Sequence, residues 1–376
     1  MPQLRPLLRR LHSSLPESVR CQVDISSVSL RDILQNWHLP GYRVCAPLPH
    51  GEGEGTILYL GNKPQYSSWT HKLFGHAVEP AFVGQFSLTQ ILRGNHPGLS
   101  ADVTLCPVNP LTSYLFRREW HIMPLFVDCL VDLRKPIGEL ITSKGAKDDL
   151  RIARRLGYEF QVPTDEAAIH EFFHQMLVPT VKARHEERAF LSQWQKIEHI
   201  YRNGVLISAH LEDEYVGAIL LALENTETVR IANIGWRNGE DQWLKKGIVA
   251  ALYNQSFVWA QQNGYHFINL GSSNPFANDG PLNFKLKWGA TLVAPELRVA
   301  QGQVEGAHAF IGVRFNLGSS AAQSFLSSTP LLEYSGGILR AISWNAEIPP
   351  LFRRQFNSGL GWINLAESSA ARSSAT

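Results

Sequence analysis

A run of five expected elements in the second half of the chain most limits the folds open to it. Apolar strands are expected over Val205–Leu211, Val216–Leu223 and Thr228–Gly235, with a short acidic turn between the first two. A helix over Leu244–Gln262 and a last strand over Phe267–Leu270 follow. Three antiparallel strands, a helix and a further strand predict an α/β (α+β) fold in which helices flank a mixed sheet.

Helices are also expected before these strands. Ala146–Leu156 has leucine and isoleucine at helical spacing, with Gly157 as a stop signal. A second helix has Asp165 in its N-cap region and is expected to end by Pro179, and a third covers Leu191–Arg202. After the run, strands are expected over residues 291–299 and 309–315, then a Ser-rich link and a helix over 331–343.

The composition sets the broad class of the protein. Of its 376 residues, 44% are hydrophobic and 18% charged, which is typical of a folded protein, and the length favours more than one domain. We expect four parts: a basic N-terminal segment over 1–19, a domain over 20–135, a second domain over 136–318, and a C-terminal extension over 319–376. The second domain carries the clearer pattern, because strand and turn signals in 20–135 are short and irregular.

Charge and cysteine usage limit the partners and the location. Lys and Arg number 35 against 33 acidic residues, so the net charge of +2 does not favour DNA. No uncharged apolar run is long enough to span a membrane. The four scattered cysteines fit a reducing, cytoplasmic setting. The arginine- and leucine-rich segment Leu4–Leu15 is a surface helix, or a segment for peripheral contact with an anionic membrane or for transit.

The segment Tyr265–Ala290 is the strongest site candidate. It reads YHFINLGSSNPFANDGPLNFKLKWGA, an apolar strand followed by a polar loop, then Lys285 among aromatic residues. Small polar residues at the end of a buried strand lie where α/β folds form binding crevices. Lys285 is expected on a strand, with Phe284 and Leu286 on the opposite face. Asp279 is interpreted as a turn residue.

The second domain resembles the FemAB-like branch of the GNAT acyltransferase superfamily. The resemblance lies in SKGAKDDLRIARRLGYEF, in the strands VGAILLALEN and TVRIANIGW, in the helix WLKKGIVAALYNQSFVWAQQNGY, and in FINLGSS with NFKLKWGA. It covers roughly 150 residues. It implies a GNAT-like mixed sheet and two tandem GNAT-like domains, the first of them degenerate. It also implies transfer of an acyl group from a thioester or aminoacyl ester to an amine.

The resemblance implies a donor side at the start of the helix between the two central strands. A helix N-terminus there attracts the phosphates of acyl-CoA through free N–H groups and the helix dipole. The cofactor-binding candidates are Gln242, Lys245, Lys246 and Gly247. The usual glycine signature is incomplete, because Val249 replaces its second small residue. The alternative interpretation is that both lysines are simply solvated.

The acceptor side is expected around the polar loop. Lys285 is the candidate for holding a substrate anion or stabilising the oxyanion, and it is otherwise a surface Lys on a strand edge. Ser272 and Asn274 complete the predicted catalytic set. The predicted substrate-binding residues are Gly271, Ser273, Arg151 and Asn233.

Two further groups of residues are candidates for chemistry, one as proton acceptors and one as metal ligands. His185, Glu186 and Glu187 can accept the amine proton, or they form a solvated loop. His170-Glu171-Phe172-Phe173-His174 matches the zinc-protease pattern but has no third ligand at a familiar spacing. We therefore expect two surface histidines and no metal.

The sequence favours an N-acyltransferase that uses acyl-CoA and acts by direct attack of a small-molecule or peptide amine. The runner-up is aminoacyl-tRNA-dependent peptide-bond formation. The basic helix from Lys144 to Arg155 is the candidate contact for tRNA or for an anionic lipid head group, and its alternative is a solvated helix face. A catalytically inactive GNAT-like binding scaffold is the alternative of another class.

Overall fold

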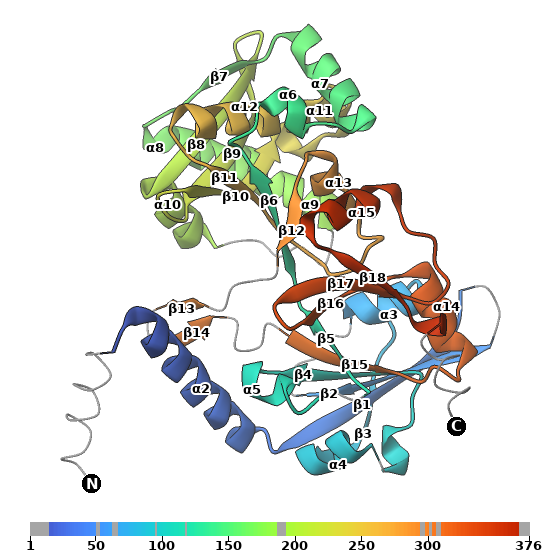
Figure 1. The fold of residues 1–376 in the computed structure, drawn as a ribbon. Helices are drawn as coiled ribbons and strands as arrows, with labels where there is room; N and C mark the ends of the chain where they lie inside the picture. Colours follow the sequence, from blue (N-terminus) through green and yellow to red (C-terminus); the bar gives the residue numbers. More distant parts are fainter. Residues whose placement is uncertain are drawn as a thin grey trace. The chain divides into compact units, whose positions relative to one another are not determined.

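The structure, a computed structural model, describes residues 15–49, 53–61, 67–94, 96–116, 119–185, 193–293, 298–300, 303–305 and 310–367. The chain forms two compact units. The first unit consists of Met1–Val127, Asn274–Asp279 and Ala294–Thr376, and the second of Asp128–Ser273 and Gly280–Val293. Each unit has a mixed sheet with packed helices (Figure 1). The predicted α/β class with mixed sheets flanked by helices is confirmed.

The division into units differs from the expected boundaries at residues 135 and 318. Residues 294–318 and the C-terminal extension belong to the first unit, and so does the short excursion Asn274–Asp279. The reason is strand pairing: β15 (Phe310–Phe315) pairs with β4 (Val103–Val108), and such long-range pairing leaves no local sequence signal. That the first unit is a degenerate GNAT-like copy stays a prediction.

The second unit is built on a seven-stranded sheet. Its strand order is β12-β6-β11-β10-β9-β8-β7. β8, β9 and β10 are consecutive antiparallel neighbours, and β10 pairs in parallel with β11, as the expected order of elements requires. The bounds are β6 (Val127–Asp132), β7 (Glu159–Gln161), β8 (Gly204–Leu211), β9 (Glu214–Leu223), β10 (Thr228–Trp236), β11 (Phe267–Ser273) and β12 (Thr291–Val293).

Helices cover both faces of this sheet because its central strands are apolar on both faces. Ala218 and Leu220 of β9 pack in one cluster with Ile169 and Met176. On the opposite face, Gly217 leaves room for Ile248 of α12 (Ile248–Gln262), since a Cβ at 217 would lie 3.0 Å from the Ile248 side chain. The other helices of the unit are α6 (Ile137–Leu140), α7 (Lys144–Leu156), α8 (Glu166–Glu171), α9 (Val178–His185), α10 (Trp194–Arg202), α11 (Asp241–Lys245) and α13 (Gly280–Lys287).

The helix that starts after Asp165 does not end at Pro179. Asp165 caps α8 by accepting a hydrogen bond from the Ala168 N–H at 2.9 Å, as expected. The chain then continues through a π-helical turn, η2 (Phe172–Leu177), into α9. The proline falls in the first turn of α9, where a missing N–H and a fixed φ are tolerated. The helical segment is therefore longer than predicted, and it carries Thr180 and Arg184.

The helix expected over Leu244–Gln262 is divided in two. α11 ends at Lys245 and α12 begins at Ile248, with Gly247 between them in the left-handed region (φ 75°). A Cβ at residue 247 would lie 3.1 Å from the backbone oxygen of Asp149. Glycine is thus required both by the turn and by the close approach of α7.

The first unit contains a six-stranded sheet of order β3-β1-β2-β4-β15-β5. β2 and β4 are parallel, whereas the β1–β2, β1–β3, β4–β15 and β5–β15 pairs are antiparallel. The bounds of the strands are β1 (His38–Pro47), β2 (Glu54–Leu60), β3 (Ala81–Ser87) and β5 (His121–Pro124). The helices are α2 (Glu17–Gln35), which the sequence did not indicate, α3 (Ser67–Phe74), α4 (Leu88–Arg93) and α5 (Pro110–Ser113).

The C-terminal region of this unit is a small sheet, not a helix. Residues 331–343 form the hairpin β16 (Leu331–Ser335) and β17 (Ile338–Ser343), which β18 (Gly361–Asn364) extends. The prediction of a helix was wrong because Gly336 and Gly337, at φ 61° and 86°, form the left-handed turn of a tight hairpin. The Ser-rich link is the helix α14 (Ser320–Ser328), and α15 (Pro350–Gln355) follows. A short hairpin pairs β13 (Arg298–Ala300) with β14 (Gln303–Glu305).

Cys45, Cys106 and Cys129 form no disulfide bonds. Among the described helices, none has the length and apolar composition of a membrane span. The segment 1–14 lies outside the described residues, so the expected membrane or transit role of Leu4–Leu15 stays a prediction, as does a cytoplasmic location.

Candidate active site

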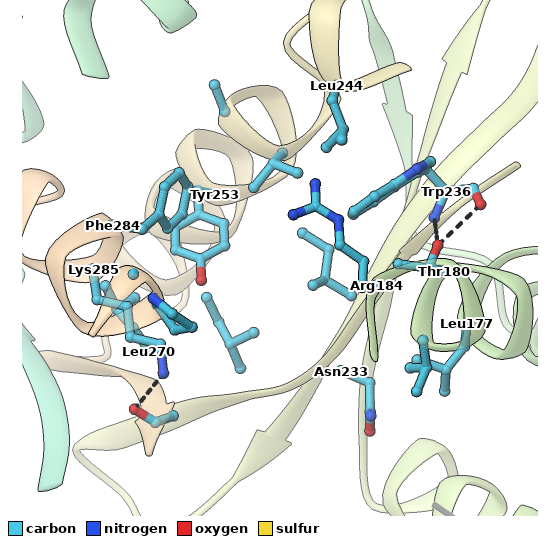
Figure 2. A pocket seen from close by; sticks show the side chains of 18 of the residues that line it. Leu177, Thr180, Arg184, Asn233, Trp236, Leu244, Tyr253, Leu270, Phe284 and Lys285 are labelled. Carbon is cyan, nitrogen blue, oxygen red and sulfur yellow. Dashed lines mark hydrogen bonds between the residues drawn. The ribbon is translucent and has the colours of Figure 1, made fainter. Parts of the chain in front are cut away.

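The second unit contains a cavity of about 730 Å³ at the point where β10 and β11 part. The two strands pair only from Thr228 with Phe267 to Arg230 with Asn269. Beyond Arg230, the edge of β10 faces the cavity through Ile231–Ile234, and the pairing of β10 with β9 shifts between Ile231 and Asn233. A shift of this kind redirects backbone groups near a site. A cavity therefore lies at the end of the strand after which the sequence predicts a site (Figure 2).

Four walls close the cavity around the two strands. Three of them are α9, the start of α12 and α13, and the fourth wall is formed by single residues of α7, η2 and α11. Thr180 of α9 is fixed to β10, because its Oγ1 accepts the Trp236 N–H at 3.1 Å and donates to the Trp236 carbonyl at 3.3 Å (Figure 2). Most of the remaining lining is apolar and comes from Leu177, Leu244, Val249, Leu270 and Phe284.

Lys285 lines this cavity but does not lie on a strand, so the predicted strand and its surface alternative were both wrong. It belongs to α13 and is 9% exposed. Its Nζ donates to the Gly271 carbonyl at 3.0 Å, the Ser272 carbonyl at 2.7 Å and the Ser273 Oγ at 3.0 Å. An ammonium has three protons, and here each has an acceptor. The side chain thus holds the end of β11 against α13.

Ser272 connects the cavity to a partly buried charge network. Its Oγ donates to Asp128 of β6 at 2.7 Å, and Asp128 also accepts from Arg230 at 2.9 Å and from Asn269 at 3.3 Å. Burial opposes ionisation, but the Ser272 hydrogen bond and the charge of Arg230 outweigh it and hold the pKa of Asp128 below its ordinary value. Arg230 also pairs with Glu224. The sequence did not indicate Asp128, because β6 is distant in the chain.

Two polar side chains that the sequence did not indicate point into the cavity. Tyr253 of α12 is 5% exposed, and burial raises the pKa of its hydroxyl well above the ordinary value, so the group keeps its proton at neutral pH. Arg184 of α9 places its Cζ 5.2 Å from the ring centroid of Trp236. Figure 2 shows its guanidinium projecting between Tyr253 and Trp236. Within the described part of the chain, Arg184 has no carboxylate partner.

The predicted donor side is only partly at the cavity. Gly247 lines it, together with Val249 and Ala250 of the first turn of α12. Gln242, Lys245 and Lys246 are not among the lining residues. The Gln242 amide donates to Glu240, and the Lys246 Nζ lies 4.4 Å from the ring centroid of Trp243. The backbone of the helix start, and not the lysine side chains, thus forms this end of the cavity.

The other predicted residues divide between the two units. Gly271 and Asn233 line the cavity, whereas Arg151 is exposed on α7 and pairs with Asp148 at 3.4 Å. Asn274 belongs to the first unit, where its amide donates to Asp279 at 3.1 Å. His185 ends α9, and Glu186 and Glu187 lie outside the described residues. Their role as proton acceptors stays a prediction.

The zinc-protease pattern has other contacts in the structure. The rings of His170 and His174 stack on Trp194, with centroid distances of 4.3 and 6.2 Å. Glu171 forms an ion pair with Arg237 at 2.8 Å. Over the described residues, no group of three His, Cys, Asp or Glu side chains is placed to hold a metal ion.

Comparison with known proteins gives fold neighbours alone. No protein-family model matches the sequence, and no curated protein matches it. Similar solved structures include L-PGS from Bacillus licheniformis, at 15% identity over 73% of this chain and 84% of that chain, with a TM-score of 0.38. FemX matches at 12% identity over 74% and 89%, also with a TM-score of 0.38.

A third neighbour is a GNAT family acetyltransferase from Elizabethkingia anophelis, solved with acetyl-CoA bound. It matches at 16% identity over 42% of this chain and 95% of that chain, with a TM-score of 0.28. FemX and the GNAT acetyltransferase are of the classes that the sequence resemblance names. All three of these TM-scores lie below 0.5.

Proposed function

We propose that the second unit transfers an acyl group from acyl-CoA to an amine. The observation that carries the proposal is the cavity between the parted strands β10 and β11, which reaches the first turn of α12. A thioester donor has an extended arm with two amides and an anionic pyrophosphate end. The open edge of β10 offers backbone donors and acceptors to the amides, and the helix start offers N–H groups to the phosphates.

The walls of the cavity suit the reacting end of such a donor. Leu270 and Phe284 provide apolar surface for an acyl chain, and backbone groups near the shift at Ile231–Asn233 can polarise the thioester carbonyl. In the reaction, the amine nitrogen attacks the carbonyl carbon, a C–N bond forms, the C–S bond breaks, and the thiolate leaves. The thiolate needs a proton, and the amine must lose one.

Two described groups fit these proton transfers. The Tyr253 hydroxyl keeps its proton at neutral pH and faces the cavity, so it can donate to the leaving thiolate. The ionised Asp128, hydrogen-bonded to Ser272 at the cavity wall, can accept the amine proton through the Ser272 hydroxyl. In this proposal Lys285 positions the end of β11 and does not touch the substrate, because its protons are already engaged.

The test is calorimetric titration of acetyl-CoA and longer acyl-CoAs into the full chain and into two glycine variants. Gly247 and Gly264 flank the same helix at φ 75° and 79°, but Gly247 alone of the two lines the cavity. Gly247→Ala is expected to weaken binding about tenfold or more, and Gly264→Ala is the matched control for backbone strain. Failure of the wild type to bind any acyl-CoA would refute the donor assignment.

Aminoacyl-tRNA is the second candidate donor, and one observation favours it. The exposed face of α7 carries five cations and forms a basic strip: Lys144, Lys147, Arg151, Arg154 and Arg155. Binding of tRNA that falls steeply with salt and is lost when Arg154 and Arg155 are replaced by Gln would promote this donor. Acyl-CoA binding without any transfer to amines would indicate the inactive binding scaffold.

A further inference from the structure

The first unit contains a cavity of its own, of about 690 Å³. Strands β5, β15, β16, β17 and β18 contribute to it, together with the 3₁₀ turn Pro97–Leu99 and Trp120. Its size lies in the range of small-molecule sites. The residues that line it all belong to the first unit, so its interpretation does not depend on the proposed acyltransferase.

The buried carboxylate of this cavity is fully engaged. Glu333 of β16 accepts from His121 Nδ1 at 3.0 Å and from Arg340 at 3.0 Å. Burial opposes its ionisation, but the hydrogen bond and charge of His121 and the charge of Arg340 outweigh it and lower the pKa of Glu333. Since an ionised carboxylate only accepts, His121 must donate from Nδ1. Glu333 therefore neutralises Arg340.

Arg314 of β15 is a second arginine in this cavity, and its contacts differ from those of Arg340. Its guanidinium is half-buried and donates to the Leu99 carbonyl at 3.1 Å, with its Cζ 5.4 Å from the ring centroid of Trp120. Among the described residues, no carboxylate lies within ion-pairing distance of it. Burial lowers the pKa of Arg314, and the exposed Glu119 opposes this only in part. Moving a charged group out of water without a partner lowers the stability of the fold. Ligand binding would account for an arginine at this position.

The surroundings keep this guanidinium in the cavity. Gly94, at φ 67°, leaves the space it occupies, because a Cβ there would lie 2.5 Å from an Arg314 Nη. Leu99, Phe315 and Ile342 supply apolar lining. An unneutralised fork of donors beside apolar walls matches a ligand with an anionic head and an apolar body.

We propose that this cavity binds a small organic anion, whose carboxylate or phosphate group pairs with Arg314 and whose apolar body packs against Trp120 and the neighbouring apolar side chains. Both head groups present the oxygen pair that a guanidinium recognises. The site is a binding site separate from the acyl-transfer cavity, and either proposal can fail without the other.

The test is titration of the full chain with three probes that share a phenyl body. Phenylacetate and phenyl phosphate carry the two head groups, and phenylacetamide is the neutral control. At least one anion is expected to bind at one site per chain, about tenfold or more tighter than the amide. The tighter anion identifies the head group. No binding of either anion by the wild type, or equal binding of the amide, would overturn the proposal.

Variants locate the site. Arg314→Gln is expected to weaken binding about tenfold or more without lowering the thermal midpoint of the free protein, because it removes an unneutralised charge. Arg314→Lys keeps the charge but loses the fork, so its affinity should lie between those of the wild type and the Gln variant. Arg353→Gln, an exposed arginine of α15, is the control. Anion affinity unchanged in Arg314→Gln would overturn the proposal.

A second pair of variants retains Arg314 and tests the position of its guanidinium. Gly94→Ala should displace the Arg314 guanidinium and weaken anion binding. Gly75→Ala has similar backbone strain, at φ 78°, but nothing lies within 4 Å of its new Cβ. Equal affinity of the two alanine variants would contradict the placement of the anion at Arg314.

Discussion

The cavities of the two units are similar in size, about 730 and 690 Å³, but Lys285 in the second unit and Arg314 in the first differ in how their donors are engaged. In the second unit, Lys285 is buried and gives each of its protons to an acceptor of β11. In the first unit, Arg314 is half-buried, and no described carboxylate pairs with it. A cation at a cavity is therefore not evidence of ligand binding until its donors have been accounted for.

The two cavities also present different groups to a ligand. The acyl-transfer cavity offers a strand edge, a helix start and a protonated Tyr253. The cavity of the first unit offers a side-chain charge beside apolar walls. Recognition in the first case combines backbone groups with the Arg184 guanidinium, and in the second it depends on side-chain charge, so the two should respond differently to substitution of these groups.

The largest expected difference is in stability. Lys285→Met should lower the free energy of unfolding by about 3 kcal/mol, because it leaves buried acceptors without a donor. Lys287→Met, two residues along the same helix but exposed, should change it by less than about 0.5 kcal/mol. Urea denaturation of both variants provides the measurement. Equal losses of unfolding free energy in the two variants would contradict the role of Lys285 in holding the end of β11 against α13.

A smaller effect is expected at Asp128, and it depends on pH. Asp128→Asn should cost about 2 kcal/mol at pH 7, because the carboxylate accepts charged and neutral hydrogen bonds. Its folded pKa lies below the unfolded value of about 3.9, so this stabilisation is present above that pH and is lost as pH falls through the folded pKa. Denaturation curves of wild type and variant should therefore converge on acidification.

The control for this loss of stability is Asp213→Asn. Asp213 lies in the β8–β9 turn at φ 65°, a conformation that Asn also adopts readily. The free energy of unfolding of Asp213→Asn at pH 7 should lie within about 0.5 kcal/mol of the wild-type value. Curves for Asp128→Asn that stay parallel to wild type below pH 4 would show that the carboxylate charge is not the source of the stabilisation.

The smallest structural effect is expected at Tyr253. Tyr253→Phe should leave the free energy of unfolding within about 0.5 kcal/mol, since the hydroxyl faces the cavity. It should reduce acyl transfer about tenfold or more at unchanged acyl-CoA affinity, if the hydroxyl protonates the thiolate. Calorimetry and a thiol-release assay measure the two quantities. An unchanged transfer rate would remove Tyr253 from the mechanism.

The sheet of the second unit could be predicted because its signals are local. β8, β9 and β10 are apolar strands separated by short turns, and the order of β8–β11 with its intervening helix was confirmed. The long helix through Pro179 could not be predicted, because the π-helical turn before the proline depends on tertiary packing. The prediction that Lys285 lies on a strand was wrong because a segment of four to eight residues with mixed polarity fits both the helical and the strand period.

The sequence indicated where this cavity lies, but it did not indicate all of the residues in and around it. The polar residues after the strand predicted over Phe267–Leu270 indicated it. Two of them, Gly271 and Ser272, lie on β11 and line the cavity, as does Gly247. Arg184 and Asp128 come from segments far from that loop in sequence, so only the fold reveals that they lie near it. The hairpin β16–β17 was missed although Gly336-Gly337 is a turn signal, since its flanking residues have no clean alternation.

The interleaving of the two units along the chain has a consequence for synthesis. β15 lies between β4 and β5 in the six-stranded sheet, but both of these strands precede the second unit in the chain and β15 follows it. The ribosome must therefore release every strand of the second unit before the sheet of the first unit can close. Once residues up to Val293 have emerged from the ribosome, the seven-stranded sheet of the second unit is complete, while β4 and β5 still present open edges that invite wrong pairing.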